Sequence, residues 1–172
     1  MRNERHKGQM MDKLFEVARR VGEKLKAHGQ TVAVAESSGG GLISAALLAV
    51  PGASAYFLGG AVVYTQQARG GLVGITDDDM KGLRSSSEPY AALLADRMRA
   101  NVNATWGLAE TGAAGPSGNR YGDPAGHTCI AIAGPKSETL TYRTGSDERY
   151  DNMLAFAIKA LETLEDGIDA GG

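Results

Sequence analysis

The sequence contains a single cysteine, Cys129, so no disulfide bond can form within the chain. No apolar run reaches the roughly 18 residues that a membrane-spanning helix needs. Neither charge sign dominates, with 18 Lys and Arg against 20 Asp and Glu, which excludes the broad basic surface of most nucleic-acid-binding proteins. The first residues, MRNERHKGQMMDK, lack the apolar core of a secretory signal. We therefore expect a cytoplasmic protein that binds neither nucleic acid nor membranes.

Glycine, in contrast, is abundant, with 24 residues among the 172. The hydrophobic content of 42% and the charged content of 22% are typical of a globular protein, and the length suits one domain. We predict a single domain over residues 10–166, between a flexible N-terminus at 1–9 and a flexible tail at 167–172. Cys129 lies in an apolar segment and is expected to be a small buried residue rather than a nucleophile.

The spacing of apolar residues predicts the order of helices and strands. Helices are predicted at 10–28, 41–49, 66–73, from 87 onward and at 148–165. Strands are predicted at 31–36, 55–64, 105–110, 127–133 and 138–143. The last two strands are separated by too few residues for a helical crossover, so they should be antiparallel. This alternation predicts an α/β fold: a three-layer α/β/α sandwich with a mixed, mainly parallel sheet of about five strands.

The most informative segment is TVAVAESSGGG, at residues 31–41. It has the pattern of a buried strand that ends at Glu36 and Ser37, followed by a glycine turn and an apolar helix. Such a turn places hydroxyls and the backbone N–H groups of Gly40 and Gly41 at the edge of the sheet, where a helix N-terminus favours negative charge. The same pattern also fits a plain turn whose glycines permit close packing.

A second polar segment follows the third predicted strand. Glu110 and Thr111 lie at its end, and a loop with five glycines and two prolines occupies residues 111–126. A loop of this length inside a compact domain is usually functional or disordered. Ligands of such sheets bind at the carboxyl ends of the strands, so we predict that both strand ends and this loop, including Gly112 and Gly115, form one small-molecule site.

Five motifs occur in a fixed order: AESSGGG at 35–41, GASAYF at 52–57, VVYTQQARGGLVGI at 62–75, SSSEP at 85–89 and ETGAAGP at 110–116. In this order and spacing they resemble the AESCTGG, GSSAWF, VTYSNEAK, GAVSEE and VTGIAGP motifs of the CinA carboxy-terminal domain family, the nicotinamide mononucleotide deamidases. The resemblance extends over roughly residues 10–165. It implies a five-stranded mixed sheet and hydrolysis of a carboxamide to an acid plus ammonia, without a metal or another cofactor.

The resemblance assigns site residues position by position. Ser37 stands where the family has its presumed nucleophile. Ser54 matches the second serine of GSS, Tyr64 the tyrosine of TYSN and Thr111 the threonine of VTG. Arg149 matches the arginine of a family GDR motif, although the residues before it differ. Tyr64 could orient the nucleophile or contribute to an oxyanion hole, but an isolated aromatic residue is often part of the core.

The family lysine falls on Arg69. Making a lysine neutral at pH 7 costs about 4.6 kcal/mol, whereas an arginine costs at least ~7.5 kcal/mol. Arg69 is therefore a poor proton shuttle and better suited to clamp a phosphate or carboxylate. Ser38-Gly39 also replace a family Cys-Thr, and Glu110 replaces an apolar residue. Two functions stay open: an amidohydrolase altered by Arg69, and a divergent or non-catalytic member that binds a phosphorylated small molecule.

The acidic residues and the loop allow alternatives. Glu36 could act as a general base or hold backbone N–H groups of a neighbouring loop. Glu110 could pair with Arg69 in the pocket or point to solvent. Arg120 and Tyr121 could contact a ligand or face water.

The predicted catalytic residues are Ser37, Ser54, Tyr64 and Arg69, and the predicted substrate-binding residues are Glu36, Gly40, Gly41, Glu110, Thr111, Gly112, Gly115 and Arg149. The three histidines lack metal-ligand spacing, so no metal site is predicted. The expected partner is a phosphorylated, nucleotide-like small molecule. Apolar stripes on the first and last helices could also serve a dimer, so we expect a homo-oligomer.

Overall fold

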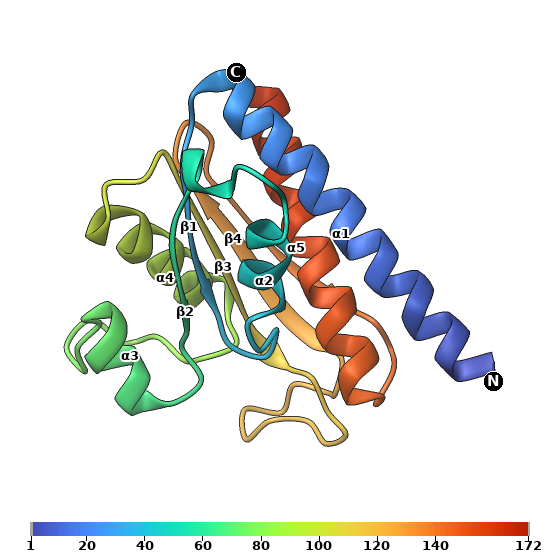
Figure 1. Cartoon of the computed structure of the whole chain (residues 1–172). Helices are drawn as coiled ribbons and strands as arrows, with labels where there is room; N and C mark the ends of the chain where they lie inside the picture. Colours follow the sequence, from blue (N-terminus) through green and yellow to red (C-terminus); the bar gives the residue numbers. More distant parts are fainter. Residues whose placement is uncertain (1, 172) are drawn as a thin grey trace.

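The computed structural model describes residues 2–171, with side chains described from Glu4 onward. Within these residues five strands form one mixed sheet in the order β2-β1-β3-β4-β5 (Figure 1). The strands are β1 (Val32–Glu36), β2 (Phe57–Val62), β3 (Trp106–Ala113), β4 (His127–Ala133) and β5 (Glu138–Arg143). The pairs β1–β2 and β1–β3 are parallel, whereas β3–β4 and β4–β5 are antiparallel. The expectation of a mainly parallel sheet was therefore too strong, because β4 runs against its neighbours on both sides.

Helices cover both faces of the sheet, which confirms the three-layer sandwich (Figure 1). One face carries α1 (Arg2–His28), α2 (Leu42–Leu48) and α5 (Arg149–Gly171). The other carries α4 (Glu88–Asn101), against which α3 (Gln66–Val73) packs. A short 3₁₀ helix, η1 (Ala53–Ala55), precedes β2.

The two faces of the sheet differ in side-chain size. Large residues such as Trp106 and Leu108 pack under α1, α2 and α5. The face toward α4 is lined by alanines and by Cys129, which is buried as predicted. The small residues let α4 approach closely, since a Cβ at Gly107 would lie 1.9 Å from the Ala95 carbonyl oxygen. Burial raises the pKa of the Cys129 thiol, which makes it a poor nucleophile at neutral pH.

The first and last helices are longer than the sequence predicted. The helix α1 begins at Arg2 and α5 continues to Gly171, so helical structure extends into both segments that were expected to be flexible. At the C-terminal side the reason is burial: Ile168 is fully buried in the core. Met1 and Gly172, which also belong to the predicted flexible ends, lie outside the described residues.

The apolar stripes of α1 and α5 pack against each other over the sheet. Leu14, Val17 and Val21 of α1 are buried in the same core cluster as Leu161 and Leu164 of α5. The stripes that suggested a homo-oligomer are therefore used inside the domain. None of the helices in residues 2–171 combines the length and the apolar content that crossing a bilayer requires.

Candidate active site

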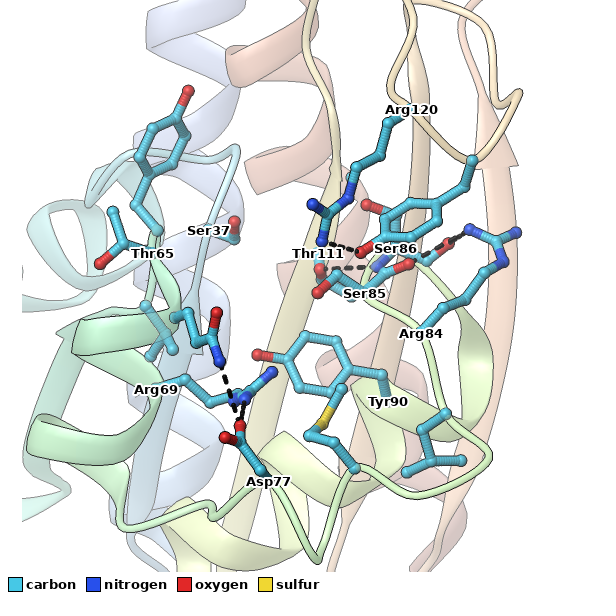
Figure 2. A pocket seen from close by; sticks show the side chains of 17 residues that line it. Ser37, Thr65, Arg69, Asp77, Arg84, Ser85, Ser86, Tyr90, Thr111 and Arg120 are labelled. Atoms are coloured by element: carbon cyan, nitrogen blue, oxygen red, sulfur yellow. Dashed lines mark hydrogen bonds and ion pairs between the residues drawn. The ribbon is translucent and has the colours of Figure 1, made fainter.

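A cavity of about 530 Å³ opens at the carboxyl ends of β1, β2 and β3. Ser37 follows β1, Tyr64 follows β2 and Thr111 lies near the end of β3, and all three line the cavity. Figure 2 shows Ser37 across the cavity from Thr111 and Arg120. The other walls come from α3, from the segment 77–86 before α4, and from the loop that includes Arg120.

The turn after β1 is built around the Glu36 carboxylate. This fully buried group accepts hydrogen bonds from the backbone N–H groups of Gly41 (2.9 Å), Ile43 (3.1 Å) and Ser44 (2.9 Å), and from the Ser44 hydroxyl (2.9 Å). It thus satisfies the orphan donors at the N-terminus of α2. Burial is the main cause that raises the pKa of Glu36. Of its two predicted roles, Glu36 takes the structural one.

The amides of Gly40 and Gly41 are also occupied, contrary to the predicted binding role of these glycines. The Gly40 N–H donates to the Ser37 carbonyl oxygen at 3.1 Å, and the Gly41 N–H donates to Glu36. Both glycines have positive φ angles, 67° and 96°, so their role is to let the chain reverse between β1 and α2. Within residues 2–171 the Ser38 amide donates no hydrogen bond.

Glu110 lies beneath the same turn. The strand register places it beside Glu36, and it too is fully buried. Its Oε2 accepts from the N–H groups of Ser37 (3.1 Å) and Gly39 (2.7 Å). Glu110 therefore neither pairs with Arg69 nor points to solvent, and both predicted alternatives were wrong. The reason is that β3 continues to Ala113, so Glu110 sits inside the sheet rather than at its end.

Arg69 is held on one wall of the cavity by Asp77. Its Nη2 lies 2.5 Å from the Asp77 Oδ1, and the Gln66 side chain donates to the same oxygen at 3.1 Å. Figure 2 shows the Arg69 guanidinium between Asp77 and Tyr90. The Arg69 Nε is buried without a hydrogen-bond partner among the described residues. Arg69 is thus a fixed cation, as expected of an anion clamp.

Two further arginines line the cavity. Arg84 forms a bidentate pair with Asp123, with Nη1–Oδ2 at 2.7 Å and Nη2–Oδ1 at 3.1 Å, which lowers the pKa of Asp123. The guanidinium groups of Arg84 and Arg120 lie 5.2 and 5.1 Å from the centroid of the Tyr121 ring. A hydrogen bond from Arg120 is the main cause that lowers the pKa of Tyr121. This positively charged wall suits an anionic ligand.

A second cavity, of about 190 Å³, adjoins the first and shares Tyr64 and Gly112 with it. Ser38, Gly115 and Arg149 line this smaller cavity. Arg149 donates to the Gly115 carbonyl oxygen at 2.6 Å and to the Tyr64 hydroxyl at 3.3 Å. Arg149, whose preceding residues differ from the family motif, thus lies at the predicted site.

Residues 14–168 match the family model of the CinA C-terminal domain. The chain belongs to this family. A CinA-like protein of Desulfosudis oleivorans is 41% identical over 145 residues, which are 84% of this chain and 35% of that protein. A CinA-like protein of Myxococcus xanthus is 39% identical over 143 residues, 83% of this chain and 34% of that protein. The chain spans about a third of the length of the curated relatives it matches.

Solved structures share the fold of this CinA domain. The competence/damage inducible protein CihA from Agrobacterium tumefaciens matches at a TM-score of 0.81 and 30% identity, covering 91% of this chain and 96% of that one. A CinA superfamily protein from Klebsiella pneumoniae gives a TM-score of 0.85 at 24% identity, covering 91% and 98%. The CinA fold expected from the motifs is therefore confirmed.

One predicted site residue of the CinA domain lies elsewhere. Ser54 is exposed in η1, which precedes β2, so it lies at the amino end of the strands. Ser37 and Tyr64 follow strands and lie at the carboxyl end. Because β1 and β2 are parallel, these two positions are at opposite rims of the sheet, and the prediction that Ser54 joins the site was wrong for this chain.

Several cavity residues of the CinA domain were not predicted. Tyr90 was predicted only as part of the helix that begins near residue 87. In the structure its side chain lines the cavity and is only 4% exposed. Arg84 precedes that helix and had no pattern to mark it, whereas Ser86 lies in the SSSEP motif at 85–89 but was not assigned to the site. Ser86 has a positive φ of 57°, and its N–H donates to the Thr111 hydroxyl at 3.2 Å. A polar residue in left-handed conformation next to a cavity would have been a useful signal, but φ cannot be read from the sequence.

Proposed function

We propose that this CinA domain is an amidohydrolase of the nicotinamide mononucleotide deamidase type. Its substrate is a phosphorylated, nucleotide-like carboxamide, and its products are the acid and ammonia. The observation that carries the proposal is that two adjacent serines and four arginines line the same two neighbouring cavities. Ser37 lines the larger cavity and Ser38 the smaller one, where β1 ends.

The charges of the site support an anionic substrate. Arg69, Arg84 and Arg120 line the larger cavity, and Arg149 lines the smaller one. Arginines recognise phosphate and carboxylate through charge-assisted hydrogen bonds, which are stronger than neutral ones. The Asp77 carboxylate that holds Arg69 is largely exposed to solvent. An anionic ligand can therefore bind beside Arg69 without displacing a buried partner.

The turn supplies groups that amide hydrolysis needs. A serine hydroxyl attacks the carboxamide carbon, and negative charge develops on the carbonyl oxygen. The Ser38 N–H, which has no acceptor within residues 2–171, is the amide of the turn that is available to stabilise this charge. The resemblance implies Ser37 as the nucleophile, but its hydroxyl makes no hydrogen bond among the described residues, and Arg69 cannot serve as its base.

The experiment is incubation of the purified chain with nicotinamide mononucleotide, with ammonia and nicotinic acid mononucleotide both quantified. The wild type should release the two products in equal amounts. A chain in which both Ser37 and Ser38 are replaced by alanine should not. Ser137→Ala, at an exposed position in the β4–β5 turn, is the matched control and should keep the wild-type rate. Wild-type release no greater than that of the double variant would refute the proposal.

A second function, binding without hydrolysis, is favoured by one observation. Arg69 stands at the position of the family lysine and is fixed by Asp77 at 2.5 Å. If the chain binds without hydrolysing, calorimetry would detect binding of nicotinamide mononucleotide, but no ammonia would form over hours at saturating ligand.

A further inference from the structure

The hydroxyl of Ser38 is joined to a buried base. It donates a hydrogen bond to Oε1 of Glu110. Within residues 2–171 one other serine hydroxyl donates to a carboxylate, that of Ser44, and it takes part in the capping of α2 by Glu36. Ser38 differs because it lines the smaller cavity, beside Arg149. Ser38 thus combines a cavity position with a proton acceptor.

Glu110 is held firmly in this position. Its Oε2 accepts from two amides of the turn, at 3.1 and 2.7 Å, and its Oε1 accepts from the Thr128 hydroxyl at 2.7 Å as well as from Ser38. No lysine, arginine or histidine in the described part of the chain forms an ion pair with it. The Ser38 hydroxyl therefore has a fixed carboxylate oxygen as its hydrogen-bond acceptor, which is the geometry that a general base needs to take the proton of a nucleophile.

We infer that Ser38 and Glu110 form the nucleophile and general base of this site. The inference rests on the proposed amide hydrolysis, and it assigns the attack to Ser38 rather than to Ser37. It also accounts for the chain having Arg69 where a lysine is expected, since the proton goes to Glu110 and Arg69 is left to bind charge.

The reaction balances with water as the only co-reactant. The Ser38 Oγ bonds to the carboxamide carbon while its proton passes to Glu110. The tetrahedral intermediate then breaks the C–N bond, and the Glu110 proton passes to the departing nitrogen as ammonia leaves. Water attacks the resulting ester and gives its proton to Glu110. Collapse breaks the ester bond, releases the acid and returns the proton to Ser38.

The variant Glu110→Gln distinguishes a catalytic role of Glu110 as general base from a purely structural role. The glutamine oxygen can accept from the amides of Ser37 and Gly39, while its NH₂ group donates to the hydroxyls of Ser38 and Thr128, which are able to accept. The turn is therefore kept and the base is lost. We expect deamidation to fall by about 10²- to 10⁴-fold, the usual contribution of general base catalysis. Glu23→Gln, on the exposed face of α1, is the matched control and should have no effect.

The serine variants give the second test. Ser38→Ala should reduce deamidation as far as Glu110→Gln does, and Ser37→Ala should reduce it less. The thermal unfolding midpoint of Glu110→Gln should not lie below that of the wild type. A rate for Glu110→Gln within a factor of two of the wild type, or a greater loss in Ser37→Ala than in Ser38→Ala, would overturn the inference.

A probe that needs no substrate separates this inference from the proposed function. An organophosphorus fluoride phosphorylates an activated serine, with loss of fluoride and of the serine proton, and tandem mass spectrometry locates the adduct. We expect labelling at Ser38 in the wild type and none in Glu110→Gln. Label at Ser38 without any ammonia release would support the pair and refute the deamidase function. Ammonia release with no label, or with label at Ser37, would refute the pair.

Discussion

Replacing Glu36 by alanine should destabilise the whole domain, because the carboxylate joins β1 to the N-terminus of α2. The change leaves the backbone N–H groups of Gly41, Ile43 and Ser44 buried without their acceptor. An unsatisfied buried donor costs about 1–3 kcal/mol, so three of them cost at least ~3 kcal/mol. That is a large part of the about 5–15 kcal/mol by which a typical domain is stable.

Glu36→Gln should cost less. The glutamine oxygen can still accept from Gly41 and Ile43, as Oε1 does now, while its NH₂ group faces the Ser44 N–H and leaves one donor unsatisfied. The expected loss is about 1–3 kcal/mol, reduced by removal of a buried charge. The order of stability is therefore wild type, Glu36→Gln, Glu36→Ala.

Thermal and urea unfolding followed by circular dichroism measure these differences. For a chain of this size, ~1 kcal/mol shifts the unfolding midpoint by about 2–4 °C, so Glu36→Ala should unfold at least ~6 °C below the wild type. Glu23→Ala, which removes a carboxylate that pairs with Arg19 on the surface, should stay within about 2 °C. If Glu36→Ala unfolded within the range of this control, the structural role given to Glu36 would be refuted.

Three further predictions concern binding, pH and packing. Arg69→Lys should raise KM about tenfold and leave kcat within about twofold, since one charge-assisted hydrogen bond is weakened; a rise in kcat would instead make residue 69 the base. The lowered pKa of Asp123 beside Arg84 adds stability above its unfolded pKa of about 3.9, which is lost as pH falls through the lower folded value. Asp123→Asn should therefore flatten the acid side of the stability curve, and an unchanged slope would contradict this. Gly107→Ala should lower the unfolding midpoint markedly, because a Cβ there would lie 1.9 Å from the Ala95 carbonyl oxygen; an unchanged midpoint would show that α4 can move away.

The pKa of Glu36 has the opposite consequence. Because burial raises it, the folded chain takes up this proton at a higher pH than the unfolded chain does. The ionised form of Glu36 is therefore less favourable to the fold than the protonated form, and stability increases as pH falls from the folded pKa toward the unfolded value of about 4.3. The stability difference between wild type and Glu36→Gln should change across that window.

Much of the fold could be predicted because local patterns mark its elements. The helix at 66–73 and the strands at 127–133 and 138–143 were predicted with the bounds that the structure has. The end of β3 was missed because Glu110 and Thr111 are polar, a usual sign of a strand end. They stay in the strand because β4 pairs with it as far as Ala113.

The site was predictable where residues follow strands. Ser37, Tyr64 and Thr111 meet at one rim because their strands run in the same direction. The partners of Glu110 were not predictable, since they depend on the register that sets it beside Glu36. Tyr90, from a helix that also packs over the sheet, carries no local signal of a cavity.

The most direct test of the proposed site is a crystal structure of the chain with nicotinic acid mononucleotide, the product that cannot react further. We predict that the ring carboxylate lies at the Ser38 N–H, within reach of the Ser38 hydroxyl, and that the phosphate contacts arginines of the two cavities. A product bound away from the turn after β1, in crystals soaked above its dissociation constant in solution, would contradict it.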